Sequence, residues 1–371
     1  MSEVRPPAAV SESAFRAFVG GLREPSALAL VIALVTAAAL LLSVPLVVDE
    51  DFMMSPDGRV FATQSNDKSV PITATLLRFA RALPPEPQVY LFGASTVRSS
   101  VDPEQLETEL LAASGHAVRA VSMTSGGQRP MEALALIDAL PAGARGVVVV
   151  GVGVPSLMYS EKYARSLVEA PRVAIRLPTL DAEAARLGVP TPSTCGNYFW
   201  DNRRYFLPRI PTAVSNALFG MKPLKPMNFL GRALPGAAQL ENGFRMKWRG
   251  FDGPDGVDST RAASLEILDR LASAVAARGG MRLVLLEDTI HPSYATRPRF
   301  VRAVESSREV YRDFAARRGV LFVGLQERAR LGVEDFADTT HVRSRQGVAR
   351  FTHELAIDLA PLVREIETTG R

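Results

Sequence analysis

The sequence predicts an α/β protein whose core is a doubly wound parallel sheet. Short apolar runs rich in Val, Leu and Ile alternate with longer stretches of helical period from residue 85 onward. A charge-free apolar segment near the N-terminus stands apart from this pattern. Because strands that alternate with helices form parallel sheets with both faces covered, we expect a flavodoxin-like strand order and a ligand site at the carboxyl ends of the strands.

The chain offers five such strands, and most of them are followed by a helix. The run from Gln88 to Phe92 is typical of a buried strand, and Asp102-Pro103 is a helix start signal. The last amphipathic stretch follows His341. Strands are predicted at 88–93, 117–122, 146–152, 281–287 and 320–324, and helices at 103–114, 130–140, 260–278, 298–318 and 344–367.

The apolar segment over residues 26–48 predicts one transmembrane helix. From Ala27 to Val48 no residue is charged, and at about 1.5 Å per residue this stretch spans about 33 Å, enough for a hydrocarbon core of roughly 30 Å. Arginines precede it and acids follow it, so the positive-inside rule places residues 1–25 in the cytoplasm and the rest outside. A cleaved signal peptide is the alternative, but no small-x-small site precedes the acids. The arginines are Arg5, Arg16 and Arg23, and the acids are Asp49, Glu50 and Asp51.

Composition agrees with one large extracytoplasmic domain behind that anchor. Residues 49–84 read as a linker and residues 85–371 as a single domain with an insertion at about 156–259. Apolar residues make up 47% of the chain, ample for a core. Cys195 has no cysteine partner in the chain, so cysteine usage does not identify the compartment, and as a nucleophile it is disfavoured.

The insertion is basic and aromatic. Between residues 197 and 250 there are nine Lys or Arg and only two acids. The same stretch contains nine aromatic residues, Trp200 and Trp248 among them. Positive charge with amphipathic rings is typical of surfaces that meet lipid headgroups or polyanions. The stretch is therefore either a lid that docks on a membrane or partner, or a cap whose rings form a small core while its cations face water. An extracytoplasmic location excludes nucleic acid as a partner.

Two short motifs supply the residues of a catalytic triad. Ser95 ends the motif Phe-Gly-Ala-Ser in the turn between a strand and a helix, and His341 ends Asp-Thr-Thr-His before the final helix. A serine hydroxyl attacks well only when an imidazole takes its proton and a carboxylate orients that imidazole. Asp338 is the candidate for the carboxylate, with Glu334 and Asp335 as competitors. Alternatively, Ser95 only caps the helix.

These residues resemble the SGNH (GDSL-like) hydrolase superfamily, over roughly residues 85–155 and 280–367. The resemblance implies Ser95 as nucleophile, His341 as base and Asp338 as its orienting partner. It also implies that Ser95 and either Gly126 or Gly127 supply N–H groups to an oxyanion hole. The family's third block normally carries an Asn, but the strand at 146–152 is followed by none. In this departure the chain is similar to membrane-anchored members, such as D-alanyl transfer and alginate O-acetylation proteins.

Other polar residues have weaker claims on the site. Arg98 and Arg129 follow the first two strand ends and are candidates for binding an anionic substrate, although solvated surface arginines are common. His291 follows a later strand end and is a candidate for lining the site. The four His and one Cys show no metal-ligand spacing, so we expect no metal and no cofactor.

The sequence thus predicts a membrane-anchored serine acyl hydrolase or O-acyltransferase that acts on acyl esters of an envelope glycan or lipid. A second hypothesis is an accessory protein that binds a polytopic membrane O-acyltransferase and has little turnover of its own. The missing Asn and the basic, aromatic insertion motivate this hypothesis. A third is a glycan-binding module without a reactive serine.

Overall fold

The structure is a computed structural model that describes residues 26–62, 68–220, 229–247 and 258–369. Five parallel strands form one sheet in the order β2-β1-β3-β4-β5, which is the flavodoxin-like order expected from the sequence. The strands are β1 (Gln88–Phe92), β2 (Arg119–Ser122), β3 (Gly146–Val152), β4 (Met281–Glu287) and β5 (Leu321–Val323).

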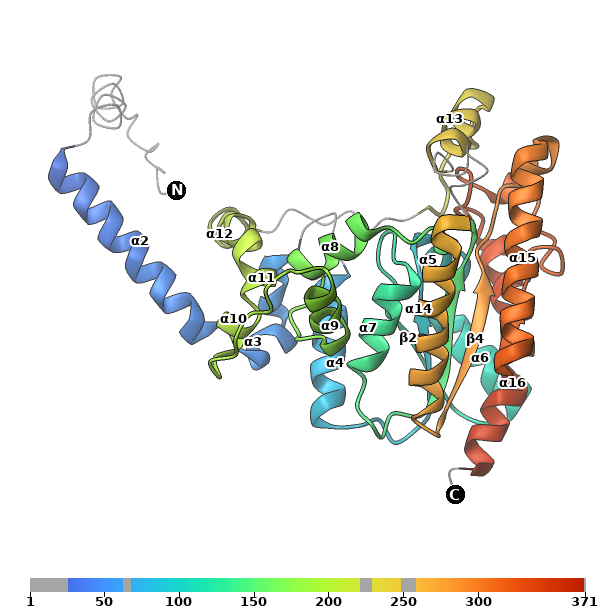
Figure 1. Cartoon of the computed structure of the whole chain (residues 1–371), viewed down its shortest axis with the longest axis horizontal. Helices are drawn as coiled ribbons and strands as arrows, with labels where there is room; N and C mark the ends of the chain where they lie inside the picture. The colour runs from blue at the N-terminus through green and yellow to red at the C-terminus, as the bar shows by residue number, and fades with distance from the viewer. Residues whose placement is uncertain (1–25, 63–67, 221–228, 248–257, 370–371) are drawn as a thin grey trace, which may run out of the picture.

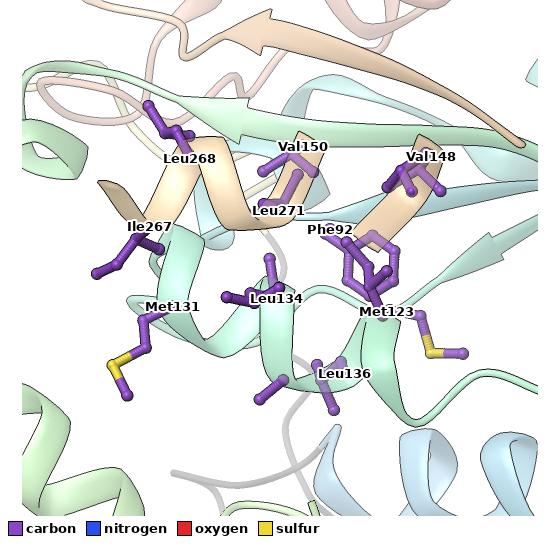
Figure 2. Close-up of a cluster of buried hydrophobic side chains, with 14 of the residues drawn as sticks. Phe92, Met123, Met131, Leu134, Leu136, Val148, Val150, Ile267, Leu268 and Leu271 are labelled. Carbon is purple, nitrogen blue, oxygen red and sulfur yellow. The ribbon is translucent and has the colours of Figure 1, made fainter. Parts of the chain in front are cut away.

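Helices cover both faces of the sheet, as the predicted alternation requires. One face packs on α5 (Ser95–Ser100), α6 (Pro103–Ser114) and α16 (Arg345–Thr369), and the core there is made of aliphatic residues such as Leu106 and Leu355. The other face packs on α4 (Ser69–Arg81), α7 (Pro130–Asp138), α14 (Asp258–Ala276) and α15 (Pro298–Arg318). In Figure 2, Leu134 of α7 and Leu271 of α14 lie close to Val150 of β3.

The segment between β3 and α14 is a cap, built from the insertion. Its helices are α8 (Glu161–Glu169), α9 (Pro178–Arg186), α10 (Tyr198–Asp201), α11 (Arg203–Phe206), α12 (Ile210–Phe219) and α13 (Ala237–Lys247), and η3 (Leu207–Arg209) joins α11 to α12. Phe199, Tyr205 and Phe206 are buried in a satellite core. The guanidinium groups of Arg203, Arg204 and Arg209 donate to backbone carbonyls of this cap.

The buried rings match the cap interpretation of the insertion, but these three arginines are half-buried and bond to the cap instead of facing water as that interpretation expected. Burial lowers the pKa of Arg209, whose guanidinium also lies over the Tyr205 ring at 4.0 Å. Lys222, Lys225 and Trp248, which belong to the same basic and aromatic stretch, lie outside the described residues.

Residues 49–84, expected as a linker, contain α3 (Glu50–Met54), the 3-10 helix η1 (Pro56–Phe61) and α4. Ile72 and Leu76 of α4 belong to the main core, because this helix is amphipathic and turns its apolar side toward the sheet. The described residues of this segment therefore pack with the folded domain, in contrast to the expected linker.

The apolar N-terminal segment forms α2 (Ala27–Val47), capped by Ser26, whose Oγ accepts a hydrogen bond from the Ala29 amide. Figure 1 shows α2 extending away from the sheet, with α10 and α3 near its end. Within the described parts of the chain, no helix meets the length and hydropathy that crossing a membrane requires. Residues 1–25, with the flanking arginines on which the predicted orientation depends, lie outside the described residues.

Candidate active site

Ser95 lies where strand β1 ends and is the first residue of helix α5, a short helix that the sequence pattern did not predict. Gly93 makes the turn possible: its φ is +137°, and a Cβ there would lie 2.6 Å from Val97 Cγ2. The first N–H groups of a helix have no intrahelical acceptor. The backbone N–H of Ser95 is one of these groups, and Ser95 lines a cavity.

The hydroxyl of Ser95 is hydrogen-bonded to His341, which is 246 residues away in the sequence. Ser95 Oγ lies 2.7 Å from His341 Nε2, and His341 Nδ1 lies 2.6 Å from Asp338 Oδ2. The ring is buried, with 8% of the residue exposed. The carboxylate requires the proton on Nδ1, which leaves Nε2 as the acceptor for the Ser95 hydroxyl. The structure therefore brings the three predicted residues together in the order that the triad needs.

Asp338 is held by its own turn. Its Oδ1 accepts hydrogen bonds from the backbone N–H groups of Thr340 and His341, at 2.9 and 3.1 Å, so that Oδ2 faces the imidazole. Of the competitors, Asp335 accepts hydrogen bonds from Gly332 and Arg350 instead. The structure thus favours Asp338 as the partner of His341.

The segment that carries Asp338 and His341, residues 336–342, is here called the histidine loop. Phe336 and Val342 form an antiparallel bridge at its base, and the His341 carbonyl accepts from the Ala337 N–H. The chain after β4 adds two bonds: the His291 N–H donates to the Thr339 carbonyl, and Thr289 Oγ1 donates to the Thr340 carbonyl. Backbone groups therefore determine most of this loop's position.

Phe229, from the insertion, stacks on the imidazole of His341. The two ring centroids are 3.8 Å apart and the planes differ by 4°. The Gly231 N–H donates to the Arg343 carbonyl, which connects this part of the insertion to the end of the histidine loop. Sequence reasoning assigned no site role to Phe229, because nothing local in the chain relates position 229 to position 341.

Residues 123–128, here called the glycine loop, lie on the other side of Ser95. The Ser125 N–H donates to the Gly93 carbonyl, and Gln128 Oε1 accepts from the Gly93 N–H at 2.5 Å. Gln128 Nε2 donates to the Met123 carbonyl at 2.9 Å. Of the two glycines proposed as oxyanion donors, Gly127, rather than Gly126, lines the cavity with Ser95.

A buried carboxyl group, that of Glu132, contacts the glycine loop. Glu132 is 4% exposed and accepts hydrogen bonds from Ser125 Oγ at 3.0 Å and from the Tyr163 hydroxyl at 2.9 Å. Burial raises the pKa of Glu132, and the nearby Arg172 opposes this. Arg172 Nη1 in turn donates to the Gly126 carbonyl at 2.5 Å. Side chains, two of them from the insertion, therefore support this loop.

The cavity at Ser95 has a volume of about 260 Å³. Asp288 lines this cavity, and its Oδ1 accepts a hydrogen bond from Thr96 Oγ1 at 2.6 Å. The carboxylate lies beside Gly153, where a Cβ would be 3.0 Å from Asp288 Oδ2. Asp288 thus lies close to the strand end at which the resemblance leads one to expect an Asn, and sequence reasoning did not single it out.

The three possible substrate-binding residues have different positions. Arg129 lines the cavity, although its Nη1 donates to the Met158 carbonyl at 2.8 Å. Arg98, half-buried on α5, is not among the residues that line the cavity. Neither is His291, whose Nδ1 accepts from the Ser293 N–H. The pKa of His291 is lowered by burial and by the charge of Arg297, and the charge of Asp338 only partly opposes this.

Among the described residues, no group of three or more His, Cys, Asp and Glu side chains is arranged to hold a metal ion. Cys195 is exposed, and its N–H donates to Asp201. No protein-family model matches the chain, and no curated protein is significantly similar to it.

Proposed function

We propose that the protein is a serine acyl hydrolase or O-acyltransferase of the SGNH type. The observation that carries the proposal is the hydrogen-bonded chain from Ser95 Oγ to His341 Nε2 and from His341 Nδ1 to Asp338 Oδ2. A helix-capping serine needs no imidazole at 2.7 Å, and a structural histidine needs no serine on an open cavity. This series of hydrogen bonds is typical of a serine nucleophile that is activated by a base.

In this mechanism Ser95 Oγ attacks the acyl carbon while His341 Nε2 takes the hydroxyl proton. Asp338 stays ionised and stabilises the imidazolium. The carbonyl oxygen becomes an oxyanion that the Ser95 and Gly127 N–H groups stabilise. His341 then gives its proton to the leaving alcohol, and an acyl-enzyme remains on Ser95. Water or a sugar hydroxyl, deprotonated by His341, takes the acyl group in the second half of the reaction.

The cavity favours a short acyl group. Its volume of about 260 Å³ is below the roughly 300 to 1,000 Å³ that is usual for sites of drug-sized ligands. Val154, Pro155 and Ile290 give it an apolar side. We infer that the acyl part of the substrate enters the cavity and that the rest of the ester, a glycan or a lipid of the cell envelope, lies outside it.

The cellular location in this proposal rests on the sequence alone. The charge-free segment 26–48 is proposed as a single-pass anchor in the inner membrane, with the main domain in the periplasm or its equivalent. A reporter enzyme fused after Arg371 should then be active only outside the cytoplasm. Release of a soluble form that begins near Asp49 would instead establish a cleaved signal peptide.

A serine-directed fluorophosphonate probe tests the catalytic proposal. We expect the detergent-extracted full chain to be labelled covalently, and the Ser95→Ala variant to remain unlabelled. Labelling that survives Ser95→Ala would overturn the proposal. An unlabelled wild-type chain that co-purifies with an integral-membrane acyltransferase would favour the accessory role, which the absence of an Asn beside Gly153 motivates.

A further inference from the structure

The four residues Ser125 to Gln128 form a β-turn beside Ser95. The Gln128 N–H donates to the Ser125 carbonyl at 3.3 Å, which closes the turn. Gly127, the third residue, has φ of +67°, whereas φ of Gly126 is not positive. Among the principal turn classes this combination defines type II, which needs glycine at the third position. A type I turn of the same residues would have the central peptide reversed.

The central peptide of this turn is held by an arginine from the insertion. Arg172, between α8 and α9, donates from Nη1 to the Gly126 carbonyl at 2.5 Å and to Ser125 Oγ at 3.0 Å. The same nitrogen lies 3.6 Å from the buried Glu132 carboxylate. The buried Glu132 carboxyl group and the Ser125 hydroxyl therefore both help to place Arg172.

This contact determines which way the Gly127 N–H points. A trans peptide is planar, so the N–H of Gly127 is antiparallel to the carbonyl of Gly126. That carbonyl points to Arg172, which does not line the cavity, whereas Gly127 does line it. We propose that Arg172 is a positioning residue that directs the Gly127 N–H into the oxyanion hole of Ser95. This inference rests on the proposed function.

The consequence of losing Arg172 is larger than the loss of one hydrogen bond. Without the guanidinium, reversal of the 126–127 peptide would turn the Gly126 carbonyl toward the oxyanion and the N–H away from it. One oxyanion donor typically contributes about 10²- to 10³-fold in rate. The contribution is lost in proportion to the reversed population, so we expect Arg172→Ala to be slower by at least about tenfold.

The rate of fluorophosphonate labelling measures this effect without knowledge of the substrate. Ser95 Oγ forms a bond to phosphorus, fluoride leaves, and the hydroxyl proton passes to His341, while the phosphonyl oxygen occupies the oxyanion hole. The variants are Arg172→Ala, Arg172→Lys and the control Arg176→Ala, which removes a cap arginine bonded to Asp181. Added guanidinium ion should partly restore Arg172→Ala, since the Arg172 side chain is 30% exposed.

Gly127→Ala provides a second route to the same peptide. A Cβ at Gly127 would meet nothing within 4 Å, so its cost comes from the positive φ alone. If both changes act through reversal of one peptide, the double variant Arg172→Ala, Gly127→Ala should be little slower than the slower single variant. Gly127→Ala also serves where Arg172→Ala does not fold.

Wild-type labelling rates in Arg172→Ala and Gly127→Ala would overturn the inference while leaving the proposed function intact. Equal slowing by Arg176→Ala would also overturn it, because that result indicates general damage to the cap. Fully additive effects in the double variant would overturn it too, because they indicate that the two residues act independently. Absence of labelling in the wild-type chain would contradict the proposed function itself. The hydrolysis of a small activated ester should show the loss in kcat with KM nearly unchanged.

Discussion

The two loops on either side of Ser95 are held by different kinds of bond. In the histidine loop, backbone groups bond to one another, to the Asp338 carboxylate and to the chain after β4. In the glycine loop, the side chains of Gln128, Glu132 and Arg172 make many of the hydrogen bonds. A loop held by many backbone bonds tolerates the loss of one side chain, whereas a loop held by buried polar side chains does not.

The largest expected effect comes from Ser95 and from His341, which the histidine loop brings to it. Ser95→Ala and His341→Ala should each reduce turnover or labelling by several orders of magnitude, and the double variant should be little worse, because residues of one catalytic unit are strongly non-additive. Turnover of a small activated ester measures this. Full activity in His341→Ala would exclude the imidazole as the base.

Asp338 has the next largest effect, and it acts inside the histidine loop. Asp338→Asn keeps an oxygen for the Thr340 and His341 N–H groups but removes the charge that faces His341 Nδ1. We expect a loss of at least about 10²-fold in kcat that is smaller than the loss in His341→Ala. A melting temperature near that of the wild type would show that the loop is intact. Unchanged kcat would leave the orienting role to another group.

Substitutions of Gln128 and Thr289 allow a direct comparison of the two loops through the labelling rate. Gln128→Ala leaves the Gly93 N–H and the Met123 carbonyl without their partner, at a cost of about 1–3 kcal/mol of stability, and should slow labelling by about 10- to 100-fold. Thr289→Val removes only one bond to the histidine loop and should change the rate by less than about threefold. Equal effects of the two substitutions would remove the distinction between the loops.

Features that depend on residues close together in the sequence could be predicted, whereas features that depend on distant residues could not. The five strands are apolar runs of strand length, and Asp338 and His341 are three residues apart, so local patterns indicate them. Helix α5 has the sequence Ser-Thr-Val-Arg-Ser-Ser, which carries no helical period, and its position follows from the turn at Gly93. Arg172 and Phe229 reach the site through the path of the insertion, which no local spacing encodes.

Phe229 tests how far the histidine loop depends on the insertion. Aromatic pairs contribute about 0.5–1.5 kcal/mol beyond their burial, so Phe229→Ala should lower kcat by about two- to tenfold through a less well oriented imidazole. Phe229→Leu keeps apolar volume without the ring and separates packing from stacking. Phe219→Ala is the matched control, since Phe219 is 84% exposed on α12. An effect of Phe219→Ala equal to that of Phe229→Ala would contradict the orienting role.

The smallest expected effect concerns stability. It compares Glu132, the buried carboxyl group beside the glycine loop, with another buried carboxylate. Burial raises the pKa of Glu132 above its usual 4.5, so the folded state favours the protonated form. The stability that this provides is fully present below pH 4.5 and is lost as pH rises through the folded-state pKa, at no more than about 1.4 kcal/mol per pH unit. Glu132→Gln does not titrate, so the melting temperature of the wild type relative to this variant should fall as pH rises.

Glu183 provides the control of opposite sign. Its hydrogen bond from Arg186 lowers its pKa below 4.5, so its contribution is present above that pH and is lost as pH falls through the folded-state value. As pH falls, the melting temperature of the wild type relative to Glu183→Gln should therefore decrease. The melting temperature of the wild type relative to Glu132→Gln should increase over the same change. Parallel curves for the two comparisons would show that burial does not raise the pKa of Glu132.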